Sequence, residues 1–306
     1  MSLRSSAAVV PIDERRAFIQ RTSRDGLTRR QAYSRLYIAG ATLLLAVCIL
    51  PLLSVFSLAV QKGMPFIGWR FFTANAAIPN LVNPDAVGGI KTPLQGTLSV
   101  VGLALVISVP FAVIIAASLF EFRNRFMSWL EVLLSTVIGL PSILFGLFVY
   151  AIIFHLKLAY SGIMGSVALS MLMVPLIAIQ SLDALRAVPD TLVEAGVALG
   201  LNRFSVMFHI ILPKARARIF TGVFLALARA AGETAPVLFV IGMTNVATLS
   251  PTSQQTTMTT FVYQLLQSPY PSQRDECWAI ALVLIAIVLL FNIVGRTLLA
   301  RAERSK

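Results

Sequence analysis

The sequence has few charged residues, and acidic residues are the scarcest of them. Only 12% of its 306 residues are charged and 57% are hydrophobic, whereas about a quarter of the residues in a soluble domain are charged. This composition excludes an ordinary water-soluble domain. Its 13 acidic residues are outnumbered by 25 basic ones, giving a net charge of +12. A net positive charge is typical of proteins that bind nucleic acid and of proteins at a membrane surface. The positions of the basic residues distinguish between these two classes.

Residues that carry enzyme chemistry are also scarce. The two histidines, His155 and His209, lack the spacing of metal ligands, and no HExxH or GxSxG element occurs. A Walker A loop ends in GK followed by Ser or Thr, yet none of the five lysines follows a glycine. The chain therefore has no P-loop for ATP and no recognisable catalytic or metal site. A polytopic membrane enzyme remains the alternative from a different class.

Long apolar runs are abundant instead. A membrane helix needs about 20 mainly apolar residues, and six stretches qualify. They are residues 36–60, 97–120, 130–154, 160–182, 219–242 and 278–300. Uninterrupted runs of this length predict helices and not barrel strands. We therefore expect an all-α polytopic membrane protein with six transmembrane helices in one membrane domain, residues 36–300, between an N-terminal segment, 1–35, and a short tail, 301–306.

Basic residues gather on one side of these predicted helices. Nineteen of the 25 lie in segment 1–35, between the second and third helices, in loop 183–218, or from Arg296 onward. Cytoplasmic segments are enriched in Lys and Arg, so we expect both termini in the cytoplasm, a lipid partner and no nucleic acid. The outer loop 61–96 has no readable fold. Cys277 is expected at the outer surface and Cys48 within the first helix, at depths that preclude a disulfide.

Loop 183–218 contains signals for two short helices. Pro189 and Asp190 suit a first helical turn, and Gly200 suits the stop. Asn202 suits the cap of a second helix that ends by Pro213. Its apolar residues Phe204, Phe208 and Ile211 have the spacing of a single helix face. An amphipathic hairpin resting on lipid is one interpretation of this loop.

A second interpretation follows from a longer pattern, EAGVALGLNRFSVMFHIILP. It resembles the EAA motif of ABC importer permeases, in which EAA is followed by three residues, G, nine residues, I, any residue, and LP. The matching residues are Glu194, Ala195, Gly196, Gly200, Ile210, Leu212 and Pro213, with glycine in place of the second alanine. The resemblance implies that this loop is the coupling loop, whose helix docks on a cytoplasmic ATPase.

Further elements resemble one branch of that superfamily. GLPSILFGLFVY, the glycines near 88–96 and above all RAAGETAP are similar to A-type permease subunits of bacterial phosphate-specific ABC transporters. The resemblance implies a type I importer (MetI-like) fold in the bacterial inner membrane and half of a phosphate pathway. It also implies a homologous second permease subunit, two ATPase subunits that bind ATP and magnesium, and an extracytoplasmic phosphate-binding protein. An importer of phosphonate, sulfate or molybdate remains the alternative within the class.

RAAGETAP places two charges in the fifth apolar run. A charge near the centre of a membrane helix costs roughly 2.5 to 3.5 kcal/mol on insertion scales, so Arg229 and Glu233 suggest a functional site. Residues four apart meet on one helix face. The pair either lines an anion pathway, with Gly232, Thr234 and Pro236, or fixes helix register as a buried ion pair. Pro236 predicts a kink beside the pair.

Overall fold

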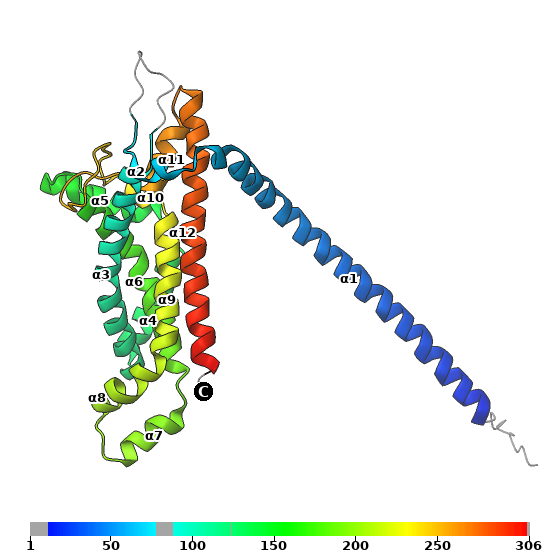
Figure 1. Ribbon diagram of the computed structural model, residues 1–306. Helices are drawn as coiled ribbons and strands as arrows, with labels where there is room; N and C mark the ends of the chain where they lie inside the picture. The colour runs from blue at the N-terminus through cyan, green and yellow to red at the C-terminus, as the bar shows by residue number, and fades with distance from the viewer. Residues whose placement is uncertain (1–11, 78–87, 123, 305–306) are drawn as a thin grey trace, which may run out of the picture. The chain divides into compact units, whose positions relative to one another are not determined.

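The computed structural model describes residues 12–77, 88–122 and 124–304, and every element within them is helical (Figure 1). This confirms the all-α class. Four helices are long and apolar enough to cross a membrane: Tyr33–Phe66, Lys91–Glu121, Gly162–Arg186 and Pro271–Leu298. Two further helices pass the same test only as a bent pair. The described part of the chain thus has four such spans, or five with the bent pair, where the sequence predicted six.

Contacts divide the chain into two units, Met1–Ser57 and Leu58–Lys306. The described part of the first unit belongs to α1 (Ile12–Gly63), a helix of 52 residues. Its apolar side chains, among them Leu36, Leu44 and Leu52, are exposed on all sides. A helix that is apolar all round requires lipid or another protein around it.

The second unit is built on four long helices that pack side by side (Figure 1). They are α3 (Lys91–Glu121), α6 (Gly162–Arg186), α9 (Leu212–Gly232) and α12 (Pro271–Arg304). α6 contacts both α3 and α9, and its Leu169, Met173 and Ile177 are fully buried. Ser166 on α6 donates a 2.9 Å hydrogen bond to the carbonyl of Val100 on α3. Small residues allow such close approach between membrane helices.

The predicted crossing 130–154 is wrong as a single helix. It consists of α4 (Arg125–Ile138) and α5 (Ile143–Leu156), which meet at a bend of 100°. The four residues between them are Gly-Leu-Pro-Ser. Pro141 cannot donate a helical hydrogen bond, and the α-helical conformation is disfavoured for the residue before it. The sequence therefore contains the reason for the break, although its apolar run hides it.

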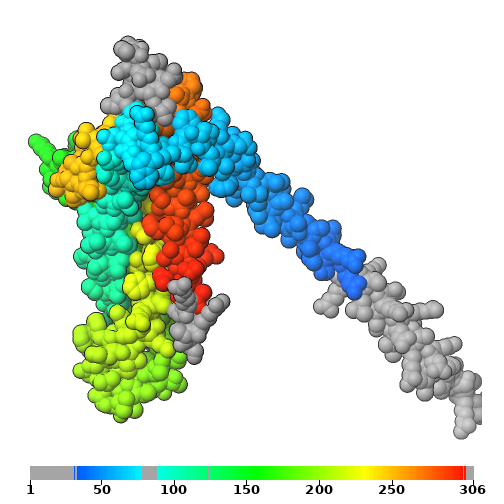
Figure 2. Space-filling model, viewed as in Figure 1, coloured from blue at the N-terminus to red at the C-terminus, as the bar shows by residue number. Residues whose placement is uncertain are grey.

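The remaining elements gather at the two ends of this four-helix core (Figure 1). α7 (Asp190–Ala198) and α8 (Arg203–Val206) lie at the end where α12 finishes, and Figure 2 shows them forming the surface there. Towards the opposite end lie η1 (Met64–Phe66), α2 (Trp69–Thr73), α10 (Ala235–Leu238) and α11 (Met258–Leu266). Loop 183–218 and the end of α12 thus share one side, as the basic residues predicted.

Cys277 does not have the accessibility that the sequence suggested. It lies in the second turn of α12, near the opposite end from α7, but only 3% of the residue is exposed. Its Sγ lies 3.8 Å from the carbonyl oxygen of Val262 on α11. Packing between α11 and α12 covers the thiol, and both Cys48 and Cys277 are free.

Candidate functional site

The charged pair lies at the end of α9. Arg229 is in the last turn of the helix, while Glu233 follows its end with extended backbone angles (φ −76°, ψ 130°). Nε of Arg229 lies 3.4 Å from Oε1 of Glu233, so the two residues meet as their spacing predicted. The side chain of Arg229 is 42% exposed and that of Glu233 is 18% exposed. The guanidinium is therefore open to a ligand or partner.

The fifth predicted crossing, 219–242, is also wrong as one kinked helix. α9 ends at Gly232, and α10 begins after a break at Glu233 and Thr234. Pro236 has no N–H for the carbonyl of Gly232, and its ring would collide with that carbonyl in a continuous helix. In the first turn of α10 the missing N–H costs nothing. A Cβ built on Gly232 would meet no atom within 4 Å, so there is open space beside the break.

Threonine hydroxyls at the start of α11 hold this break. Oγ1 of Thr259 donates a 3.0 Å hydrogen bond to the backbone carbonyl of Glu233. Thr257 lies 3.0 Å from the hydroxyl of Thr259 and 3.1 Å from that of Thr260, and all three residues are buried. No role was predicted for these residues. The sequence feature that could have identified them is the run QTTMTT, which is polar in a mainly apolar chain.

The second group of candidate residues lies at the other end of α9, in the predicted coupling loop. α7 follows Pro189, and Gly200 beyond its end has φ +82°. The Asn202 side chain accepts a 2.7 Å hydrogen bond from the N–H of Ser205, capping α8. These start, stop and cap signals are confirmed. Arg229 is 17 residues after Leu212, so the two groups are about 25 Å apart along α9.

The residues of the EAA-like pattern face in two directions. Glu194 and Ala195 are exposed on α7. Gly196 is buried, and a Cβ there would lie 2.5 Å from Cδ1 of Ile210. The glycine that departs from the family pattern thus allows α7 to pack closely on the isoleucine of the same pattern. Because the obstacle is the end of a flexible side chain, alanine would need only a small shift.

The predicted end of the second short helix at Pro213 is wrong. α8 continues through a π-helical segment, η2 (Met207–Ile211), directly into α9, with Pro213 in the first turn of α9. A π turn contains an extra residue and so shifts the helix face. Phe204 and Phe208 share an exposed face, with ring centroids 4.5 Å apart, whereas Ile211 is buried. The single face predicted for all three residues is therefore interrupted at η2.

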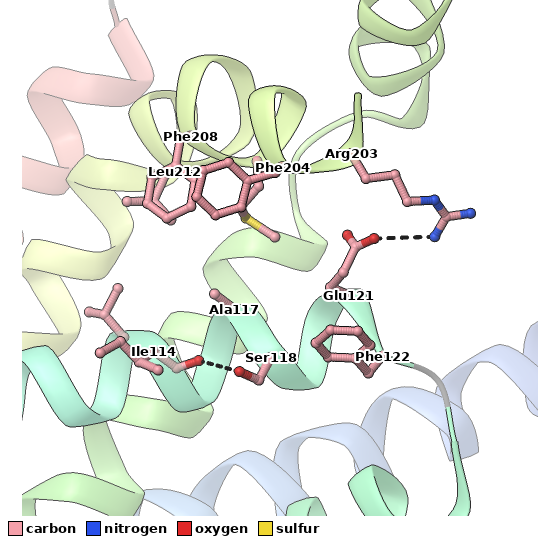
Figure 3. A pocket seen from close by; sticks show the side chains of 11 residues that line it. Ile114, Ala117, Ser118, Glu121, Phe122, Arg203, Phe204, Phe208 and Leu212 are labelled. Atoms are coloured by element: carbon pink, nitrogen blue, oxygen red, sulfur yellow. Dashed lines mark hydrogen bonds and ion pairs between the residues drawn. The ribbon is translucent and has the colours of Figure 1, made fainter. Parts of the chain in front are cut away.

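Two ion pairs that were not predicted connect this loop to the helical core. Nη1 and Nη2 of Arg186, the last residue of α6, lie 2.7 and 2.8 Å from the two carboxylate oxygens of Glu131 on α4. Nη1 of Arg203, the first residue of α8, lies 3.2 Å from Oε1 of Glu121, which ends α3 (Figure 3). The partners are 55 and 82 residues apart, so no local spacing reveals them.

Comparison with curated proteins shows relatives across most of the chain. It is 34% identical over 256 residues to the probable phosphate transport system permease protein PstA of Methanocaldococcus jannaschii, covering 83% of this chain and 88% of the relative. It is 31% identical to the phosphate transport system permease protein PstA of Haemophilus influenzae, covering 78% and 83% of the two chains. These relatives are permeases, which excludes the membrane-enzyme alternative.

Solved structures share the fold at low sequence identity. A chain of the MetNI methionine ABC transporter aligns with a TM-score of 0.54 at 16% identity, covering 69% of this chain and 96% of the other. A chain of a bacterial alginate ABC transporter, in complex with an alginate pentasaccharide-bound periplasmic protein, aligns with a TM-score of 0.53 at 14% identity, covering 89% and 94%. The fold is therefore that of ABC importer permeases.

A family model described as "binding-protein-dependent transport system inner membrane component" matches residues 108–306. The matched region contains both groups of candidate residues, the EAA-like pattern and the charged pair. Together with the apolar helices, the match makes this a multi-pass inner-membrane protein. The chain belongs to the family of inner-membrane permease components of binding-protein-dependent transport systems.

Proposed function

We propose that this chain is one of two permease subunits of an ATP-driven phosphate importer and forms half of the translocation pathway. The observation that carries this proposal is the similarity, over about four fifths of the chain, to relatives named as phosphate transport permeases. The similarity to structures below 20% identity supports the fold alone. The assignment of phosphate as the substrate therefore rests on the relatives of higher sequence identity and on the chemistry of the RAAGETAP segment.

Arg229 is the residue proposed to meet phosphate. A guanidinium donates two parallel hydrogen bonds to phosphate oxygens, a geometry that lysine lacks. Its partner Glu233 is 3.4 Å away, a distance that leaves the arginine donors free for better-aligned acceptors. When no anion is bound, Glu233 would pair with Arg229. Its negative charge would also favour release of the anion from the site. Gly232 ends α9, Thr234 lies in the break, and Pro236 lies in the first turn of α10. Together they would leave space for the anion beside Arg229.

The partners of the proposed complex fit surfaces that this chain leaves uncovered. α5 buries Phe145, Val149 and Ile153 but exposes Phe148 and Phe154 on another face. An exposed apolar face of this kind suits a homologous second permease subunit in a heterodimer. Exposed Glu194 on α7 is proposed to face one of two ATPase subunits, which would bind ATP and magnesium. No cofactor is assigned to this chain.

The complex is proposed to have α7, α8 and both termini on the cytoplasmic side of a bacterial inner membrane. The concentration of basic residues on that side supports this orientation. The phosphate-binding protein would then dock at the opposite end, where α2, α10 and α11 lie (Figure 1). The described residues of the outer loop, 61–77 and 88–96, and the long loop between α10 and α11 would provide that surface.

Uptake by intact cells tests the substrate. A strain that lacks this chain, complemented with it or with an empty vector, is supplied with radiolabelled phosphate, sulfate or phosphonate. We expect the chain to restore high-affinity phosphate uptake and to leave the other two unchanged. Restoration of sulfate or phosphonate uptake instead would contradict phosphate as the substrate while leaving the permease assignment intact.

A further inference from the structure

The two ion pairs found beside the coupling loop have a common arrangement. Both arginines flank α7, with Arg186 before it and Arg203 after it. Both acids belong to α3 and α4, which are consecutive helices: Glu121 ends α3, and Glu131 lies in the second turn of α4. Each end of the segment that contains α7 is thus joined to the same helical hairpin.

The Arg186–Glu131 pair is the stronger of the two. Both of its hydrogen bonds are short, and parallel donation from one guanidinium to one carboxylate fixes direction as well as distance. The Glu131 side chain is 32% exposed and is the only acidic residue of α4, a mainly apolar helix. An acidic residue in such a helix is costly unless it is paired. Arg203 is 83% exposed and makes one 3.2 Å contact, so that pair contributes less.

Cavities border the second pair on both sides. One of about 460 Å³ is lined by residues of α3, α7, α8 and η2, including Glu121, Asp190 and Arg203. The other, of about 520 Å³, is mainly apolar and lies between α3 and the α8–η2 turn (Figure 3). Dense packing transmits displacement, and cavities interrupt it. These cavities separate part of α7 from α3, so the Arg203–Glu121 pair supplements the apolar packing of Val193 of α7 on the hydrophobic core that includes Leu119.

The hairpin leads from the coupling loop to the charged pair at the other end of α9. α4 continues through the 100° bend into α5. A Cβ on Gly146 of α5 would lie 2.5 Å from the carbonyl oxygen of Pro236, so α5 contacts the backbone of α10 directly. α10 begins immediately after the break that contains Glu233. A movement of α4 therefore has a contiguous route to that break.

We propose that Glu131 and Arg186, supported by Glu121 and Arg203, are positioning residues that transmit movement of α7 through α4 and α5 to the break beside Arg229. This inference rests on the proposed function and adds a route to it. α9 provides a direct connection, and the α4–α5 route acts alongside it. The route runs from α7 to the end of α6, across the Arg186–Glu131 pair to α4, and through the bend to α5 and its contact at Gly146 with α10. The Arg203–Glu121 pair holds α8 to α3 beside it.

The test uses the complete complex with its ATPases and binding protein in liposomes. Glu131→Gln removes the charge and keeps the shape, and the exchanged pair Glu131→Arg with Arg186→Glu restores opposite charges in reversed order. Asp275→Asn is the matched control for assembly and basal ATP hydrolysis, because Asp275 makes a 3.1 Å ion pair with Lys62 away from this route. The measurements are assembled complex, basal ATP hydrolysis, its stimulation by loaded binding protein, and phosphate imported per ATP hydrolysed.

We expect Glu131→Gln to assemble and hydrolyse ATP at the basal rate. Its stimulation by binding protein and its import per ATP should fall about two- to thirtyfold, the range for mutations that alter coupling between sites. The exchanged pair should recover at least half of the loss, and Asp275→Asn should match the unmodified chain in assembly and basal ATP hydrolysis. Recovery separates a positioning role from simple loss of stability.

Two outcomes would overturn this proposal. One is full stimulation and import per ATP in Glu131→Gln; the other is a loss in Glu131→Gln that the exchanged pair does not reduce. Failure of the proposed function has a different signature, because the unmodified complex would then show no stimulation by phosphate-loaded binding protein.

Discussion

At the scale of single residues, the position of Arg229 decides what its replacement reveals. It is partly exposed at a helix end and makes one long contact with Glu233, so it is not a tightly buried strut. An ion pair that fixes the positions of two helices is expected to have short, bidentate hydrogen bonds, like those that join Arg186 to Glu131. The guanidinium is thus accessible, as the proposed contact with phosphate requires, and replacement of Arg229 tests that contact.

The first prediction concerns Arg229→Lys. Lysine keeps the charge but loses the planar fork, so uptake of radiolabelled phosphate per assembled complex should fall roughly ten- to hundredfold, the equivalent of one charge-assisted hydrogen bond. Arg218→Lys, on the same helix but near its start, serves as the comparison and should retain uptake. Normal uptake by Arg229→Lys would exclude bidentate contact with phosphate.

The double replacement Arg229→Gln with Glu233→Gln tests the ion pair itself. Removing both charges leaves no orphaned partner, so assembly should survive. If the arginine acts on phosphate, the double variant should import almost none. Near-normal uptake would show that the pair only holds the helices together, and the anion's route would have to lie on other helices or in the partner permease.

Gly200 gives a second prediction at this scale. Its φ of +82° suits glycine, and no neighbouring atom would obstruct a side chain, so the backbone alone is tested. Gly200→Val should destabilise the turn after α7 by roughly 1 to 2 kcal/mol or more and reduce ATPase stimulation. Gly102→Ala, also without a neighbour within 4 Å but inside α3, should leave stimulation unchanged. Equal stimulation in both variants would contradict the coupling assignment of this turn.

At the scale of elements, the broken helices are the feature that positions the site. Each break has a proline beside it: Pro141 lies two residues before α5 begins, and Pro236 is the second residue of α10. α5 and α10, the helices that follow the two breaks, meet at Gly146 and Pro236. Their contact places the start of α10, and therefore the carbonyl and side chain of Glu233, relative to the core.

Gly146→Ala tests this contact. The added methyl would lie 2.5 Å from the carbonyl oxygen of Pro236 and 2.7 Å from its Cα, so the two helices must separate. Overpacking of this kind costs about 1 to 3 kcal/mol. We expect reduced phosphate uptake with α7 still able to bind the ATPase, measured by co-purification. Full uptake by Gly146→Ala would mean that the α5–α10 distance does not control the pathway.

At the scale of the whole molecule, sidedness can be tested directly, although not with the natural thiols. Cys277 is buried, so an impermeant reagent would fail to reach it from either side. In a variant with both cysteines replaced by serine, Val246→Cys and Leu199→Cys offer better sites, since these residues are 70% and 82% exposed. They lie after α10 and after α7, at opposite ends of the second unit.

We expect an impermeant maleimide to label Val246→Cys in intact spheroplasts and Leu199→Cys only after the membrane is permeabilised. Protein that carries neither cysteine controls for background. The reverse pattern would place α7 and α8 outside the cell and exclude contact with a cytoplasmic ATPase. Labelling of both sites before permeabilisation would mean that they do not lie on opposite sides.

The sequence by itself determined the class, the two short helices of the EAA-like segment and the charged pair. These depend on local patterns: apolar runs, helix start and stop residues around 189–202, and two charges four residues apart. Such signals act within a few residues, so they are visible along the chain. The same local chemistry explains the breaks at Pro141 and Pro236, which a count of apolar residues overlooks.

Only the tertiary structure decided which distant groups meet. Glu131 finds Arg186 55 residues away, and Thr259 reaches the carbonyl of Glu233 across 26 residues. The fit of Gly146 against Pro236 likewise depends on how α5 is turned after its bend. These contacts follow from helix packing, in which side chains far apart in sequence become neighbours, and no periodicity or spacing along one helix encodes them.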